Sequence, residues 1–486
     1  MADQQSPGSF TIDDVTVIDG TGAPGFHGSV TVEGGRMTRV VRHDGAADPA
    51  RPVLAPGFID THTHDDFAVL LHPEMGFKVQ GGVTTCVVGN CGMGAAPFDI
   101  ASLMAATLHP GRDVAPWDGY AGYLDAVGSA PPSVNVAGLV GHGTVRGSVM
   151  GLDEDPPDGR QLDAMRAIVA EGMDAGCVGM STGLAYEPGC FASTDEIVEL
   201  ASVVAAFGGL YTTHMRDEGD DLLDAVDESI GIGRRAGLPV VISHLKATGR
   251  MNWGSVADAL ARIDAAGPTV AADQYPYTAA STILAAVVGR GRIGTDVDAT
   301  GVVVASTASH PEWHGRSLAD IAGDLGVAED DAGPAVLDAE PTATVILHAM
   351  SEDDVRTIMA HPGIMIGSDG LPTLEGVPHP RLYGTFARVL GRYARDEAVL
   401  SLEEAVHRMT GRSADVFGLR DRGRIAVGNH ADLVMFDPVE VIDRATYADP
   451  QQDPAGIMGV WVNGERVVRD GLHLGARPGA VLRRGR

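Results

Sequence analysis

Several features that would assign this sequence to a particular class of protein are missing. It contains no apolar run of the ~18 residues that a membrane-spanning helix needs, which excludes such a helix. Residues 1–10 are polar and carry no basic-then-apolar leader, so we expect a cytoplasmic protein. The 64 glycines follow no Gly-X-Y repeat and no low-complexity tract occurs, which excludes a collagen-like or disordered chain.

Cysteine and basic residues are scarce. The four cysteines do not suggest a disulfide framework in a chain of this size without a leader. Only 35 Lys and Arg residues stand against 65 Asp and Glu, and the net charge of −30 argues against nucleic acids and anionic membranes as partners. Lysine itself occurs only at Lys78 and Lys246, so any mechanism that requires a lysine has two candidates.

Both ends of the chain have the pattern of short strands. Phe10–Ile18 and residues 29–33 alternate apolar and polar residues, and Asn463-Gly464 marks a hairpin turn between two apolar runs. We therefore expect residues 1–55 and 421–486 to combine in one small β-sandwich domain.

The middle of the chain, residues 56–420, alternates strand-like runs with helices, which predicts βα units around a parallel sheet. The patterns Ser193-x-x-Glu196 and Ser401-x-x-Glu404 are typical of helix starts. Eight such units fit a (β/α)8 TIM-like barrel, an α/β fold of about 250 residues plus insertions. The strands are expected to end near His64, Gly89, His142, Ser181, His214, His244, Asp273 and Asp369.

One connection in this pattern is unusually long. Residues 285–340 separate the seventh strand from the eighth, which is far more than an ordinary connection needs. We expect residues 285–345 to form an insertion, a lid subdomain within the barrel domain.

Chemically useful side chains follow the ends of the predicted strands. One apolar strand ends in His62-Thr-His64, and alternation along a strand turns both imidazoles to the same side. A second strand leads to the Gly-flanked Cys91, and later strands end in His214, His244 and Asp369. Zinc takes nitrogen, sulfur and oxygen donors of these kinds, so the set predicts a zinc site at one end of the barrel.

Each of these residues also has a plainer interpretation. A single strand-end histidine is more often a hydrogen-bonded structural residue, a Gly-flanked cysteine is more often part of the core, and Asp369 before Gly370 is a typical turn residue. It is the joint pattern that favours a metal site. His72, His109 and His473 follow no such pattern and are expected to be bystanders.

Longer motifs add to this pattern over nearly the whole chain. They lie at Val140–Arg146, Ser181–Gly189, Tyr275–Leu284 and Gly423–Val434. Together with the strand-end residues they resemble the amidohydrolase superfamily, and most closely the D-aminoacylases (N-acyl-D-amino-acid deacylases).

The resemblance implies a particular metal site. Many amidohydrolases bridge two metals with a carboxylated lysine from the fourth strand, but no lysine lies between Lys78 and Lys246. In D-aminoacylase-like proteins a cysteine after the second strand replaces it, and Asn90-Cys91-Gly92 matches this motif. The implied tight zinc site is Cys91, His214 and His244, with a weaker second position at His62, His64 and Asp369. Cys86, Cys177 and Cys190 match no motif and are taken as structural.

The resemblance also implies a reaction, the hydrolysis of an N-acyl-D-amino acid to a carboxylate and a D-amino acid. Zinc activates water and polarises the carbonyl, and Asp369 takes the proton and returns it to the leaving nitrogen. Lys246, Tyr275, Ser281 and Arg381 match positions that hold the substrate's α-carboxylate, with Tyr186 nearby, and a cation beside a guanidinium fork suits a carboxylate. Arg290 and Arg292 either favour an acidic substrate side chain or are solvated loop residues.

Two other readings stay open. The first is another amidohydrolase, such as a cyclic amidase or an acyl-dipeptide-like hydrolase, although the missing fourth-strand lysine weighs against a dihydropyrimidinase. The second is a catalytically inactive scaffold, against which the complete set of six ligand candidates argues. The sequence by itself predicts neither a preference for D or L substrates nor an oligomeric state.

Overall fold

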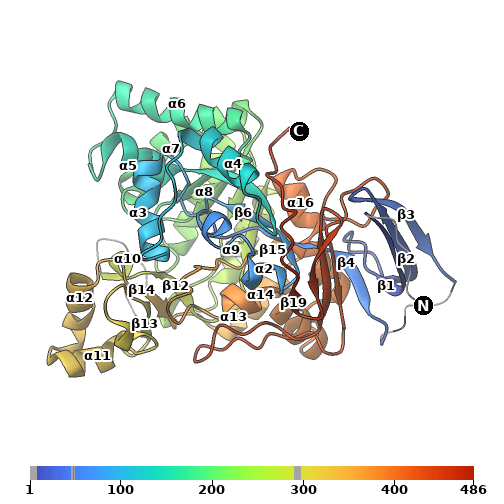
Figure 1. The fold of residues 1–486 in the computed structure, drawn as a ribbon. Helices are drawn as coiled ribbons and strands as arrows, with labels where there is room; N and C mark the ends of the chain where they lie inside the picture. Colours follow the sequence, from blue (N-terminus) through green and yellow to red (C-terminus); the bar gives the residue numbers. More distant parts are fainter. Residues whose placement is uncertain (1–7, 45–47, 49, 289–296, 486) are drawn as a thin grey trace.

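The computed structural model describes residues 8–44, 48, 50–288 and 297–485. Its centre is a parallel barrel of eight strands, surrounded by helices (Figure 1). The first and last strands meet through an isolated parallel bridge between Thr63 and Gly370, which nearly closes the barrel. The predicted (β/α)8 architecture is therefore confirmed, with all eight strands near the expected ends. They are β5 (Phe58–Asp60), β6 (Val83–Val88), β7 (Asn135–Gly141), β8 (Gly179–Gly183), β9 (Leu210–His214), β10 (Val240–Ile242), β11 (Val270–Gln274) and β15 (Ile364–Ile366).

Helices cover the outside of the barrel, and both predicted serine caps are present. Ser193 accepts a hydrogen bond from the Glu196 backbone at the start of α7, and Ser401 accepts one from Glu404 at the start of α15. The covering helices are α1 (Ala68–Leu71), α2 (Gly76–Val79), α3 (Phe98–Leu108), α4 (Gly119–Ser129), α5 (His142–Met150), α6 (Gly159–Ala175), α7 (Thr194–Ala206), α8 (Leu222–Ala236), α9 (Val256–Ala266), α13 (Glu352–Ala360), α14 (Arg381–Arg388) with its π-helical continuation η4 (Val389–Asp396), α15 (Leu402–Met409) and α16 (Gly411–Phe417).

The barrel interior has its own apolar core. Along β6, Val87 belongs to this inner cluster while its neighbours Cys86 and Val88 pack against the helices, as strand alternation requires. Phe417 and Leu419, at the end of α16 and just after it, belong to the inner cluster too and plug one end of the barrel. The polar residues that follow the strands therefore gather at the other, carboxyl-terminal end.

Strands from both ends of the chain form a second eight-stranded sheet, in the order β19-β18-β17-β16-β4-β1-β2-β3 (Figure 1). It curls onto itself: Phe10 of β1 stacks on Trp461 of β17 with ring centroids 5.9 Å apart, although two strands lie between them. The expected sandwich is thus one curled sheet, and Asn463-Gly464 forms the predicted two-residue turn between β17 and β18. The strands are β1 (Ser9–Val17), β2 (Phe26–Glu33), β3 (Arg36–Arg42), β4 (Val53–Pro56), β16 (Leu433–Phe436), β17 (Ile457–Val462), β18 (Glu465–Arg469) and β19 (Leu472–His473).

The long connection before β15 forms a subdomain at one side of the barrel (Figure 1). A three-stranded antiparallel sheet, in the order β12-β14-β13, packs with three helices around a separate apolar cluster. Its elements are β12 (Ala280–Ile283), α10 (Leu284–Val288), β13 (Val302–Ser306), α11 (Leu318–Leu325), α12 (Glu329–Ala339) and β14 (Thr344–Leu347). Arg290 and Arg292 lie outside the described residues. In the described part of the chain, no helix is both long and apolar enough to cross a membrane.

Candidate metal centre and active site

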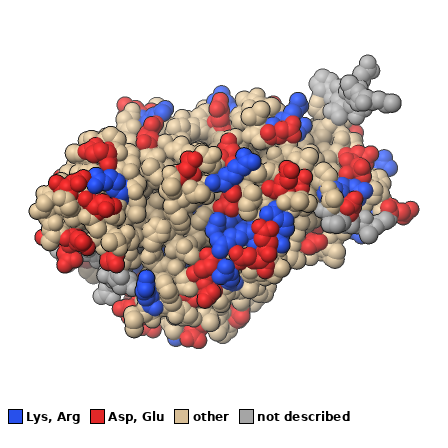
Figure 2. Space-filling view, turned by 90° about the horizontal axis from the view of Figure 1, so that it is seen from below, with Lys and Arg blue, Asp and Glu red and all other residues tan. Residues whose placement is uncertain are grey.

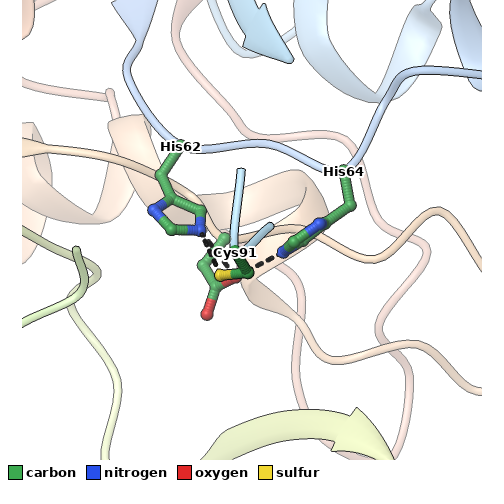
Figure 3. A group of neighbouring side chains, drawn as sticks. His62, His64 and Cys91 are labelled. Atoms are coloured by element: carbon green, nitrogen blue, oxygen red, sulfur yellow. Dashed lines mark hydrogen bonds and ion pairs between the residues drawn. The ribbon is translucent and has the colours of Figure 1, made fainter. Parts of the chain in front are cut away.

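The six residues expected to bind zinc meet at the carboxyl-terminal end of the barrel. His62 and His64 follow β5 and turn toward Cys91, which follows β6 (Figure 3). His214 ends β9, His244 follows β10, and Asp369 follows β15; all six side chains are buried.

Two overlapping groups of donor atoms share the Cys91 thiol. Its Sγ lies 3.2 Å from His62 Nε2, 3.5 Å from His244 Nε2 and 3.9 Å from His214 Nδ1. Asp369 Oδ1 lies 3.2 Å from His64 Nε2 and 3.4 Å from His62 Nε2. Sequence analysis predicted both groups, and the structure brings every member of them together.

Three of these residues have a backbone conformation that L-residues rarely adopt. Cys91 has a φ of 52°, His244 of 36° and Asp369 of 50°. Such left-handed conformations are costly for residues other than glycine and persist where the surrounding fold enforces them. The backbone is thus strained at the positions that aim the thiol, one imidazole and the carboxylate into the centre.

The electrostatics of the centre favour a bound cation. Burial raises the pKa of the Cys91 thiol, but His62 and hydrogen bonds from His214 and His244 outweigh burial and hold the pKa well below its usual value. Burial likewise raises the pKa of Asp369, and Arg381 and the imidazoles bring it well below normal. A thiolate, a carboxylate and imidazoles around one point are the donor set that zinc takes.

The histidines respond to the same charges. Burial lowers the pKa of His64, but Asp369 and Cys91 raise it to about 9. The pKa of His62 is raised well above its usual value by Cys91, Asp369 and Asp273, again against burial. Burial instead lowers the pKa of His214, so the anionic donors favour the charged forms of His62 and His64 but not that of His214.

A buried carboxylate that sequence analysis did not identify lies behind the tight site. Glu218 Oε1 is 2.9 Å from His244 Nδ1 and 2.6 Å from Lys246 Nζ, and Glu218 Oε2 is 3.7 Å from His214 Nε2. Burial raises its pKa, but Lys246 and the two imidazoles lower it more. In the sequence, Glu218 stands among Asp217, Asp220 and Asp221, and nothing there distinguishes it.

Asp273, predicted only as a strand end, has a similar position on the other side of the centre. Its Oδ1 accepts a hydrogen bond from the backbone N–H of His244 at 2.6 Å and lies 3.7 Å from His62 Nδ1. The Asp273 carboxylate therefore holds the backbone of His244 in place and faces the imidazole ring of His62.

Four of the five expected substrate residues line one cavity with the metal centre. Its wall includes Lys246, Tyr275, Ser281 and Tyr186, together with His214, His244 and Asp369. The Tyr186 ring packs edge-on against His214, with centroids 4.7 Å apart, and its hydroxyl meets Thr282 Oγ1 at 3.1 Å.

Arg381, the fifth expected substrate residue, lies directly beside these groups. Its Nη1 is 2.9 Å from Asp369 Oδ2, its Nη2 donates to the Ser281 carbonyl at 3.0 Å, and its guanidinium covers the Tyr275 ring at 4.5 Å. Its buried Nε has no hydrogen-bond partner among the described residues. A buried donor without a partner is costly, so this atom is free to bind an acceptor.

The other cysteines lie outside the centre, as expected. All four cysteines of the chain are free; Cys86 and Cys177 are buried in the core, and Cys190 is partly exposed. His72 and His109 pack against each other, with ring centroids 5.6 Å apart, and belong to neither donor group.

Comparison with known proteins identifies the family of this chain. The sequence profile described as "Amidohydrolase family" matches residues 52–468. The chain belongs to the amidohydrolase family. It is 43% identical to an N-acyl-D-glutamate deacylase of Alcaligenes xylosoxydans xylosoxydans over 476 residues, which are 96% of this chain and 95% of that protein.

Solved structures place this amidohydrolase in the D-aminoacylase family. A D-aminoacylase with a binuclear metal centre superposes with a TM-score of 0.87 at 40% identity, covering 98% of this chain and 99% of that one. An N-acyl-D-glutamate deacylase from Bordetella bronchiseptica, complexed with zinc and a phosphonate inhibitor, gives a TM-score of 0.87 at 39% identity with the same coverage. The family suggested by the motifs is confirmed.

Proposed function

We propose that this amidohydrolase is a zinc-dependent N-acyl-D-amino-acid deacylase, which hydrolyses the linear amide bond to a carboxylate and a D-amino acid. The observation that carries the proposal is the buried thiolate, imidazole and carboxylate set that opens into a cavity with carboxylate-binding groups. Relatives at 39–43% identity include a D-aminoacylase and N-acyl-D-glutamate deacylases, one of them complexed with zinc.

Cys91, His214 and His244 form the proposed tight zinc site, and His62, His64 and Asp369 complete a weaker second position around Cys91. Zinc bound there supplies an acidified water and polarises the amide carbonyl. The donor set fits, because the surroundings lower the pKa of both the thiol and the carboxyl group and so favour their ionised forms.

Asp369 is the proposed general base and then general acid. Arg381 holds its Oδ2 at 2.9 Å, which leaves Oδ1 on the side of the histidines, where the reacting water belongs. The carboxylate is ionised, so it can take the proton from the water and then deliver it to the leaving nitrogen.

Lys246, Tyr275, Ser281 and Arg381, with Tyr186 nearby, are the proposed substrate-binding residues. The α-carboxylate belongs beside the unpartnered Nε of Arg381 and Ser281, since a planar guanidinium is well suited to a carboxylate. That placement puts the amide carbonyl between this anchor and the metal centre.

We further propose that residues 285–345 act as a lid and that the two chain ends form the small domain with the boundaries given above. The lid joins the cavity wall at both of its ends: Ser281 and Thr282 in β12 directly precede it and Leu347 in β14 directly follows it, so movement of the lid can shift these wall residues. Reduced hydrogen exchange in α10–α12 when a phosphonate analogue binds would support the lid; unchanged exchange there would argue against it.

The substrate is a small molecule in this proposal, and the site of action is the cytoplasm. One face of the molecule carries mixed acidic and basic side chains (Figure 2), as on an ordinary solvated surface. Neither nucleic acid nor membrane is a proposed partner, because the net charge is −30.

A screen of paired N-acetyl D- and L-amino acids on zinc-loaded protein tests the proposal. We expect release of free amino acid from the D series, lost on chelation and restored by zinc. Hydrolysis confined to cyclic amides or dipeptides would identify another amidohydrolase, and no turnover with zinc bound would indicate an inactive scaffold.

A further inference from the structure

Glu218 is the one carboxylate that faces both imidazoles of the tight site from behind, within the described residues. Each of its two carboxylate oxygens faces one ring: Oε1 lies 2.9 Å from His244 Nδ1, and Oε2 lies 3.7 Å from His214 Nε2. The opposite nitrogens, His244 Nε2 and His214 Nδ1, face Cys91. Each ring thus has one nitrogen toward the metal centre and the other toward Glu218.

We infer that Glu218 is a positioning residue that fixes the tautomers of His214 and His244, so that both rings present a lone pair to the metal. A neutral imidazole carries one N–H and one lone pair, and the group that accepts the N–H decides which nitrogen is free. A carboxylate behind a metal-binding histidine also makes the ring a better donor. The inference rests on the proposed zinc site and deepens it.

Because of Lys246, the tautomer of His244 has to be controlled. Lys246 Nζ lies 2.7 Å from His244 Nδ1, and donation to that atom would put the proton on Nε2, on the metal side. Glu218 opposes this outcome, because its Oε1 lies 2.9 Å from the same Nδ1, where it can accept the Nδ1–H, and also binds Lys246 Nζ at 2.6 Å. The ammonium then donates to Glu218 and to the His244 carbonyl at 3.0 Å, and its third N–H is left for the substrate.

His214 supplies the independent second half of the argument. Its Nε2 is buried and has no hydrogen-bond partner among the described residues. The facing carboxylate oxygen is Glu218 Oε2 at 3.7 Å, and a shift of roughly 0.5–1 Å brings the two atoms to hydrogen-bond distance when Nδ1 binds metal. A glutamine at position 218 offers one acceptor oxygen and one NH₂ donor, and it cannot serve both rings.

The test is zinc affinity, measured by competition with a chelating dye on purified Glu218→Gln protein. Loss of a supporting carboxylate typically weakens metal binding by about 10–100-fold, and we expect a change of that size. Glu196→Gln is the matched control: Glu196 is also a buried glutamate, 3.0 Å from His142 Nε2, but His142 belongs to neither donor group. The control should retain the zinc affinity of the unaltered protein.

A double variant separates two effects on zinc affinity, that of the imidazole tautomers and that of the buried charge of Lys246. In Glu218→Gln with Lys246→Met, no buried ammonium is left without a partner, yet the second acceptor is still missing. We expect zinc binding to stay weak in this double variant. Glu218→Asp, which keeps a carboxylate with two acceptor oxygens on a shorter side chain, should bind zinc more tightly than Glu218→Gln. Full recovery in the double variant, or unchanged affinity in Glu218→Gln, would overturn the inference.

These outcomes are distinct from those that test the proposed function. Tight zinc binding that depends on Glu218, in a protein that cleaves no N-acyl-D-amino acid, refutes the activity and leaves the role of Glu218 intact. Zinc-dependent deacylation together with unchanged zinc affinity in Glu218→Gln refutes the role of Glu218 and leaves the activity intact.

Discussion

Lys78 closes the barrel through a buried ionic network, and replacing it should destabilise the protein strongly. Its Nζ lies 2.8 Å from Asp60 Oδ2, 3.3 Å from Asp65 Oδ2 and 2.9 Å from Ser368 Oγ. Asp60 Oδ1 in turn accepts the backbone N–H of Ser368 at 2.7 Å. The network ties β5, the first barrel strand, to the segment after β15, the last.

The cost of Lys78→Met follows from this burial. The side chains of Lys78, Asp60 and Asp65 are at most 1% exposed, so the variant leaves two carboxylates buried without their cation. Removing one partner of a buried ion pair typically costs about 3–5 kcal/mol. That loss is a large part of the roughly 5–15 kcal/mol that separates folded from unfolded protein.

Urea unfolding of the metal-free protein measures this loss. Arg39→Met is the control, since Arg39 is exposed and should cost under about 0.5 kcal/mol. The double variant Lys78→Met with Asp60→Asn should be more stable than Lys78→Met alone, because one unpaired charge is gone. A Lys78→Met protein as stable as the Arg39→Met control would refute the reasoning.

Two further predictions concern acid stability and substrate binding. Burial, His72 and Arg112 lower the pKa of His109 in the folded protein to about 4. On acidification the unfolded chain therefore binds this proton first, near pH 6.5. The free energy of unfolding should fall by up to about 3 kcal/mol between about pH 6.5 and pH 4. His109→Gln should lose less stability between pH 7 and 4.5 in urea titrations; equal losses in both proteins would contradict this. Arg381→Lys removes a fork that reaches both Asp369 and the Ser281 carbonyl, so KM for N-acetyl-D-amino acids should rise about 10-fold or more while zinc stays at the tight site. Steady-state kinetics check this, and an unaltered KM would exclude Arg381 from the substrate site.

The barrel and the donor set could be predicted because both leave strong local patterns. Each barrel strand is a short apolar run, and His62-x-His64, Cys91, His214, His244 and Asp369 come directly after such runs. Parallel strands of one barrel bring their carboxyl ends together, so residues far apart in sequence had to meet.

The supporting residues could not be predicted, because their role depends on three-dimensional neighbours. Glu218 resembles the acidic residues around it, and only the fold shows that it contacts His244 and Lys246. In the sequence, Lys78 stands out only as one of two lysines, and the structure shows that it pairs with Asp60. Strand alternation predicted that the two chain ends combine in one domain, but it did not predict a single curled sheet, since curvature depends on long-range packing such as Phe10 on Trp461.

The central claim is that Cys91 binds the zinc that this enzyme uses, and zinc content measures it directly. Elemental analysis after dialysis should find zinc in the unaltered protein and in Cys86→Ala, whose buried thiol should cost only about 1 kcal/mol of stability. Cys91→Ala should lose its tightly bound zinc and nearly all deacylase activity, because two imidazoles alone remain at the tight site. A Cys91→Ala protein with the zinc content and turnover of the unaltered enzyme would contradict the account.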